Sequence, residues 1–157
     1  MTGAPDAAPT PPACAVRGML DPSGRVRIVT RNLRFDAEGQ TSLPAEADHP
    51  SALDLLVAAL ATDLLAGLRR AAARAGLALH DAELSLAARL DNPLVALGVV
   101  GEDGSPGLAA LRGALYVHTE ASERTLETLW GQVLAHAPVY ATLCRAAHVR
   151  IDLKPIP

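Results

Sequence analysis

The clearest hydrophobic pattern of the chain lies between Ser51 and Gly76. Apolar residues recur there every three or four positions, as expected for a helix that buries one face. Ser51 is suited to cap the start of this helix, with Asp54 three residues later as its capping-box partner, and Gly76 is suited to end it. The apolar stripe consists of Leu53, Leu56, Val57, Leu60, Leu64, Leu68 and Ala71.

A second helix is predicted to begin at Ser122, with Glu123 in its first turn. Pro138 interrupts this helix, because proline cannot donate the backbone hydrogen bond of a helix interior. A further short helical piece is expected over residues 140–146. The buried face of the second helix is predicted to hold Leu126, Leu129, Trp130, Val133, Leu134 and Ala137.

Extended segments are predicted on both sides of these helices. Before the first helix, two strands flank the turn residues Asp21-Pro22-Ser23-Gly24, and a third short strand follows. After it, apolar and β-branched runs are separated by clusters of Asp, Asn, Pro and Gly. The predicted strands are 15–20, 25–30, 33–35, 83–90, 94–100, 112–119 and 149–153, with loops at 36–49 and 101–107.

This order of elements predicts an α+β fold in a single domain over residues 14–157. The preceding residues 1–13 are rich in Ala, Pro and Thr and carry too little apolar surface to fold, so we expect a disordered tail there. The net charge of −3, without a basic block, argues against nucleic-acid binding.

Neither a membrane span nor a targeting signal is expected. Asp54 and Asp63 interrupt the longest apolar run, and the N-terminus lacks the basic start and apolar centre of a signal peptide. The cytoplasm is therefore the expected location. The two cysteines, Cys14 and Cys144, have neither the number nor the spacing for a disulfide framework or a metal site, and no cofactor is predicted.

Two stretches of the sequence resemble the OsmC/Ohr family. HPSALDLLVAALATDLLAGLRRAAARAGL, at 49–77, is similar to the family's central helix. ASERTLETLWGQVLAHAPVYATLCRAAHVRIDL, at 121–153, is similar to its second helix, the proline-containing turn and the last strand. The resemblance implies an OsmC-like fold, with antiparallel-rich sheets around a long buried central helix and a second helix, in an intertwined homodimer.

The resemblance also implies a chemistry, the reduction of organic hydroperoxides in the response to oxidative stress. Family members use one cysteine in the central helix and a second before the Pro-Val turn, assisted by a glutamate near the start of that helix and by an arginine from the N-terminal strands. In this sequence Asp63 and Ala137 occupy the two cysteine positions, and Leu53, next to Asp54, occupies the glutamate's place. The arginine could be Arg25, Arg27 or Arg34.

Asp63 is the central candidate residue of this altered site. It lies on the flank of the apolar stripe, and a buried carboxylate is costly unless a cation or a hydrogen-bond donor compensates it. Asp63 would therefore act either as a general base or ligand anchor in the former peroxidase pocket, or as part of a structural ion pair, for example with an N-terminal arginine. A carboxylate cannot follow the thiolate–sulfenic acid–disulfide cycle.

Other side chains near the two motifs are weaker candidates. Thr62 precedes Asp63, His136 precedes Ala137, and Tyr140 and Cys144 follow the turn. Cys144 is either a relocated redox thiol or a small buried hydrophobic residue. The histidines lack a short ligand spacing on one element, so we predict no metal site.

Three functions remain open from the sequence. The leading one is an OsmC-like homodimer without thiol-peroxidase activity, which either binds a small apolar ligand or keeps only a structural role. The second is an enzyme with altered chemistry that uses Asp63 as a base. The third is a hydroperoxide-reducing enzyme that uses Cys144.

Overall fold

A computed structural model describes residues 14–38 and 47–156 of the chain. The predicted tail at 1–13 and the middle of the predicted loop at 36–49 lie outside these residues. The chain forms two compact units, Met1–Ser51 and Ala52–Pro157.

The N-terminal unit contains a three-stranded antiparallel sheet. Its strands are β1 (Arg17–Leu20), β2 (Val26–Thr30) and β3 (Leu33–Ala37), so the predicted hairpin and third strand are confirmed. The Asp21 carboxylate holds the first turn, because it accepts hydrogen bonds from the backbone N–H groups of Ser23 and Arg25 at 2.9 and 3.1 Å. Gly24 supplies the positive φ (87°) that this turn requires.

The two faces of this sheet differ in character. Residues paired across neighbouring strands share a face, so Gly18, Ile28 and Phe35 lie on one side. This first face also carries Leu20, Val26, Thr30, Leu33 and Ala37, so it is largely apolar. The opposite face carries Arg17, Met19, Arg27, Val29, Arg34 and Asp36.

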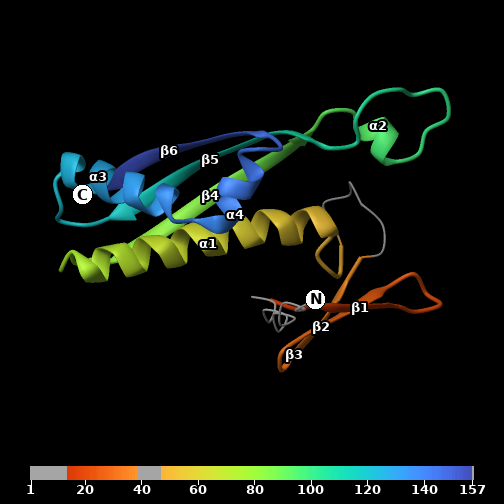
Figure 1. The fold of residues 1–157 in the computed structure, drawn as a ribbon, viewed down its shortest axis with the longest axis horizontal. Coiled ribbons are helices and arrows are strands. Elements are labelled where there is room, and N and C mark those ends of the chain that lie inside the picture. The colour runs from red at the N-terminus through yellow and green to blue at the C-terminus, as the bar shows by residue number, and fades with distance from the viewer. Residues whose placement is uncertain (1–13, 39–46, 157) are drawn as a thin grey trace, which may run out of the picture. The chain divides into compact units, whose positions relative to one another are not determined.

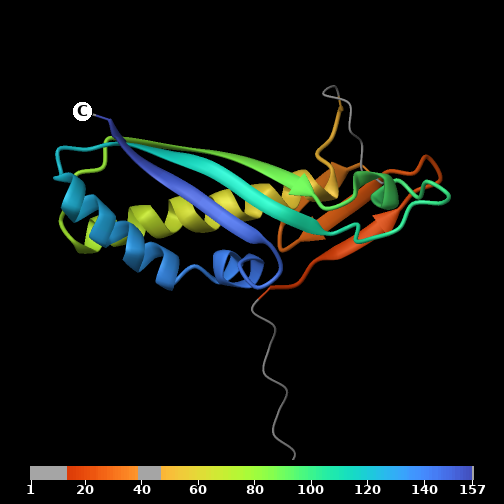
Figure 2. The ribbon, with the colours of Figure 1, turned by 90° about the horizontal axis from the view of Figure 1, so that it is seen from above.

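The C-terminal unit is built on α1 (Ala52–Arg74), which confirms the first predicted helix. β4 (Asp81–Leu90), β5 (Leu108–His118) and β6 (His148–Ile156) form a three-stranded sheet in that order, with β5 and β6 parallel. α3 (Glu123–Ala135) and α4 (Pro138–Leu143) connect β5 to β6. α1 and α3 pack together along this sheet, and α1 also contacts α4 (Figures 1 and 2).

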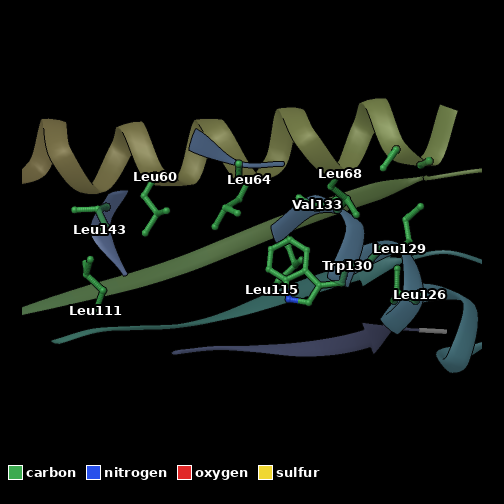
Figure 3. Close-up of a cluster of buried hydrophobic side chains, with 14 residues drawn as sticks. Leu60, Leu64, Leu68, Leu111, Leu115, Leu126, Leu129, Trp130, Val133 and Leu143 are labelled. Atoms are coloured by element: carbon green, nitrogen blue, oxygen red, sulfur yellow. The ribbon is translucent and has the colours of Figure 1, made fainter. Parts of the chain in front are cut away.

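The core of this unit lies between the helices and one face of the sheet. Leu60, Leu64 and Leu68 of α1 are fully buried, and they face Leu111 and Leu115 of β5 (Figure 3). The side chains that α3 and α4 add to this cluster are Leu126, Leu129, Trp130, Val133, Ala137 and Leu143. The other face of the sheet is polar and exposed, with alternation along β4 and β6.

Ser122 caps α3, as predicted, and accepts a hydrogen bond from the backbone N–H of Thr125. α1 begins immediately after Ser51, and Gly76 follows its end with a positive φ of 65°. The start and end signals in the sequence therefore located the two long helices correctly.

The predicted strand at 94–100 is wrong. The structure has a short helix there, α2 (Pro93–Ala96), followed by turns. Asn92 caps α2 by accepting from the backbone N–H of Leu94, and Pro93 stands in its first turn. These two helix-start signals outweighed the β-branched residues Val95, Val99 and Val100, which had suggested a strand.

Among the described residues, none of the helices has the length and apolar character needed to cross a membrane.

Candidate functional site

Asp63 links α1 to the start of α4. Its Oδ2 accepts hydrogen bonds from the backbone N–H groups of Val139 and Tyr140, at 2.8 and 3.3 Å. The side chain is partly buried, and these donors lie 76 and 77 residues further along the chain. The sequence predicted a cation or a hydrogen-bond donor for Asp63, and in the structure backbone amides take that role.

The chemistry of α4 explains why these amides need an acceptor. The first N–H groups of a helix have no partner within the helix, and a side chain at the N-cap position usually accepts from them. Ala137 occupies the N-cap position of α4 and has no side chain able to do so. The carboxylate of Asp63 therefore caps α4 from the neighbouring helix, and its negative charge is also favourable at a helix N-terminus.

Apolar packing surrounds this junction between α1 and α4. Ala137 is buried, at 5% exposure, and Leu143 on the last turn of α4 is 7% exposed. In Figure 3 Leu143 lies near Leu60 of α1 and Leu111 of β5. The site candidates Asp63 and Ala137 are thus brought to the same junction, at the edge of the main core.

Two of the weaker candidates contact backbone carbonyls of the helical turn that precedes them. Thr62 is exposed, and its hydroxyl donates to the carbonyl of Ala58 in its own helix at 2.8 Å. His136 is also exposed, and its Nδ1 lies 2.8 Å from the carbonyl oxygen of Gln132 in α3. This contact holds the His136 ring against the preceding helical turn.

Two of the three candidate arginines interact within their own sheet. Arg27 Nε lies 3.0 Å from Asp36 Oδ1, and Arg25 Nη1 lies 3.6 Å from Asp36 Oδ2. The hydrogen bond from Arg27 holds the pKa of Asp36 below its usual value. Arg34 is exposed on the arginine-bearing face of this sheet. The ion pair between Asp63 and an N-terminal arginine stays a prediction.

Tyr140 and Cys144 lie close together on α4 and its C-cap. Tyr140 is partly buried, and this burial, followed by its contact with the Cys144 thiol, raises the pKa of its hydroxyl. Cys144 is exposed, which contradicts the alternative of a small buried hydrophobic residue. It borders an open depression of about 510 Å³ together with Asp91, Ser105, Arg145 and His148.

A second open depression lies at the far end of the sheet. It has a volume of about 410 Å³ and is bordered by Asp81, Glu83, Tyr116 and His118. Sequence reasoning did not single it out, because its bordering residues come from the three strands β4, β5 and β6, and only strand pairing brings them together. Within residues 14–38 and 47–156, no three His, Cys, Asp or Glu side chains are placed to hold a metal ion.

One comparison with known proteins identifies a family. The model of the OsmC-like protein family matches residues 45–154. A comparison with curated proteins finds no match.

Solved structures similar to this chain share its fold at low sequence identity. An OsmC-like protein from Mycoplasma pneumoniae has a TM-score of 0.78 at 14% identity, over 94% of this chain and 100% of that one. An organic hydroperoxide resistance protein from Elizabethkingia anophelis has a TM-score of 0.70 at 11% identity, over 94% and 99%. OhrB of Bacillus subtilis, also an organic hydroperoxide resistance protein, has a TM-score of 0.57 at 16% identity, over 90% and 98%. With the family match over most of its length, the chain belongs to the OsmC-like protein family.

Proposed function

We propose that this chain is an OsmC-like protein in which the junction between α1 and α4 has lost thiol chemistry and has gained a structural role. On this proposal, Asp63 and Ala137 stand where the reactive and the resolving cysteine of the family's peroxidases stand. The observation that carries it is the pair of hydrogen bonds from Val139 and Tyr140 to Asp63, which engage the carboxylate in holding α4.

The chemistry supports this assignment. Reduction of a hydroperoxide by a dithiol breaks the O–O bond, oxidises two thiols to one disulfide, and yields an alcohol and water. Neither the Asp63 carboxylate nor the Ala137 methyl group can donate these electrons. The same engagement argues against Asp63 as a general base, since Oδ2 already accepts two N–H groups.

The protein is further proposed to be a homodimer. The N-terminal sheet exposes large apolar side chains on one face, with Leu20 and Leu33 at 73% and 65% exposure. The first half of α1 is apolar on nearly all sides, yet Leu56 is 36% exposed and Ala58 and Ala59 are also exposed. Such surfaces are normally covered in a folded protein, and a second copy would cover both.

A small apolar molecule is the ligand class that the exposed apolar part of α1 would accept. Leu56 and Ala59 precede Asp63 by seven and four residues, so the three side chains lie on one face of α1. The exposed thiols of Cys14 and Cys144 are in keeping with the reducing cytoplasm as its location.

The replacement of the two thiols is tested by restoring them. In a background with Cys14→Ser and Cys144→Ser, we expect Asp63→Cys/Ala137→Cys to form an intrachain disulfide when one equivalent of cumene hydroperoxide is added. Mass spectrometry and thiol counting follow this conversion. The single variant Asp63→Cys is the matched control, because it has no second thiol. A double variant that keeps both thiols free would contradict the assignment of these positions.

The exposure of Cys144 favours one second candidate, hydroperoxide reduction through that thiol. Cys144 is open to solvent and borders the same depression as Arg145 and His148. Exposed surroundings with basic side chains are typical of reactive cysteines. This candidate predicts hydroperoxide turnover that disappears in Cys144→Ser and persists in Cys14→Ser.

A further inference from the structure

The exposed face of the β4–β5–β6 sheet has a basic end, formed by three arginines and one histidine. Strand pairing places Arg112 beside Arg150 in one row of side chains. The next row begins with Arg89 and ends with His148. Both rows point away from the core, because Leu111, between them in β5, is fully buried. Neighbouring strands and alternate residues lie about 5 and 7 Å apart, so the four side chains start within an area of roughly 7 by 10 Å.

The arginines of this basic end keep hydrogen-bond donors for a ligand. Among the residues that the structure describes, Arg89 and Arg112 form no ion pair. Arg150 contacts Asp152 Oδ1 through Nε at 3.0 Å, which leaves its two terminal nitrogens. A guanidinium group can hold a phosphate through two parallel hydrogen bonds. The basic end could therefore bind more than one phosphate group.

The depression beside Cys144 adjoins this basic end, where β4 ends and β5 and β6 begin (Figures 1 and 2). It shares His148 with the sheet and is also bordered by Arg145, Asp91 and Ser105. The Asp91 carboxylate would repel a phosphate but can accept hydrogen bonds from hydroxyl groups, and the Ser105 hydroxyl can donate or accept. Groups suited to phosphates and groups suited to hydroxyls are thus neighbours.

We propose that this end of the sheet binds a small phosphate ester with more than one phosphate group. The phosphates lie on the basic end, and the hydroxylated part of the molecule lies in the depression. The chain as a whole has a net charge of −3, so this group of cations does not follow from an excess of basic residues. The inference goes beyond the proposed function, because it involves neither Asp63 nor a thiol.

The charges on the rest of the sheet favour a compact ligand over a long polyanion. At the opposite end of the same exposed face, β4 carries Asp81 and Glu83. A nucleic acid that followed the sheet would bring its phosphates next to these carboxylates, at a cost in binding free energy. A molecule confined to the basic end and the depression avoids this repulsion.

Isothermal titration calorimetry of the full-length chain tests the proposal. The probes are ATP and fructose 1,6-bisphosphate, which distinguish a nucleotide from a sugar phosphate as the source of the phosphates. We expect one or both to bind with a Kd below about 1 mM, and more weakly as the salt concentration rises, because salt screens exposed charges. The absence of binding for both probes in this range would overturn the proposal.

Substitutions locate the site. Arg112→Ala is expected to raise the Kd of the bound ester at least about fivefold, as for the loss of a charged hydrogen bond, with an unchanged circular dichroism spectrum. Arg69→Ala removes the same charge from an exposed position of α1 and should change the Kd by about twofold or less. Equal effects of the two substitutions would refute the site, since they would indicate a diffuse attraction.

The depression is tested separately. Asp91→Ala should weaken binding of the ester but not of inorganic tripolyphosphate, which has no hydroxylated part for Asp91 to hold. An unchanged Kd of the ester in Asp91→Ala would contradict the placement of the hydroxylated part in the depression.

Discussion

At the scale of single residues, the α1–α4 junction depends on one carboxylate that replaces a local cap. Ala137 leaves the first amides of α4 without a neighbouring acceptor, and Asp63 supplies one from α1. Hydrogen bonds to a charged acceptor are stronger than those between neutral groups. The junction therefore depends on Asp63 for stability.

Removing this acceptor should destabilise the fold. Asp63→Ala is expected to lower the free energy of unfolding by roughly 1–3 kcal/mol, because the N–H groups of Val139 and Tyr140 lose their partner in a partly buried site. Asp63→Asn should cost less, since its amide oxygen can still accept. Urea denaturation measures both. The neighbouring exposed Thr62→Ala should stay within about 0.5 kcal/mol. Equal effects of Asp63→Ala and Thr62→Ala on the free energy of unfolding would contradict the structural role of Asp63.

The ionisation of Tyr140 predicts a loss of stability at alkaline pH. Burial raises the pKa of Tyr140 in the folded state, so folding favours the neutral phenol. This contribution is complete below the pKa of the unfolded chain, about 10, and is lost as the pH rises through the folded pKa. The melting temperature of the wild type should therefore fall relative to Tyr140→Phe above about pH 10. A constant difference across the alkaline range would show that Tyr140 does not contribute in this way.

At the scale of elements, the central strand β5 and the helix α3 use glycine for different reasons. A Cβ added at Gly113 would collide with the backbone carbonyl of Ser85 in β4, so the pairing of these strands requires glycine there. A Cβ added at Gly131 of α3 would meet no atom within 4 Å. Only the first position is constrained by packing.

The two glycines should respond in opposite directions to the same substitution. Gly113→Ala is expected to destabilise the protein by at least about 2 kcal/mol, because backbone rather than a flexible side chain must move. Gly131→Ala should stabilise it by roughly 0.5–1 kcal/mol, since alanine is the better helix former. Thermal and urea denaturation measure the change in stability that each substitution causes, including its sign. A tolerated Gly113→Ala would mean that β4 and β5 pair less closely than in the structure.

The elements also show which parts of the fold were accessible from the sequence. Local signals such as Ser122, Gly76 and the spacing of the apolar residues located the long helices, because those signals act within a few residues. The region after Asn92 was misread, because short β-branched runs are compatible with strand and helix alike. The partner of Asp63 could not be predicted, since it is a pair of backbone amides 76 and 77 residues away.

At the scale of the whole molecule, the residues that hold the fold together differ from those that would carry out a reaction. The fold rests on the packing of α1, α3 and α4 against the second sheet, which needs no reactive side chain. A fold can host different functions, and its activity depends on the residues at the site. For this reason the resemblance to the family predicted the architecture, whereas the proposed function depends on the residues at positions 63 and 137.

The proposed dimer makes a prediction at this scale. Light scattering should give about twice the chain mass of 16.3 kDa at micromolar concentration. Leu56→Asp, in the exposed apolar part of α1, should raise the dimer Kd at least about tenfold. Ala73→Asp, exposed near the end of the same helix, should leave the Kd nearly unchanged. Equal effects of the two substitutions would place the dimer interface elsewhere.

The most direct measurement is the consumption of an organic hydroperoxide by the purified wild-type protein in the presence of a dithiol reductant. If the α1–α4 junction has lost thiol chemistry and no other thiol has replaced it, consumption stays at the background rate of the reductant alone. Turnover by the wild type that disappears in Cys144→Ser would contradict this account and would place the family's reaction at a relocated thiol.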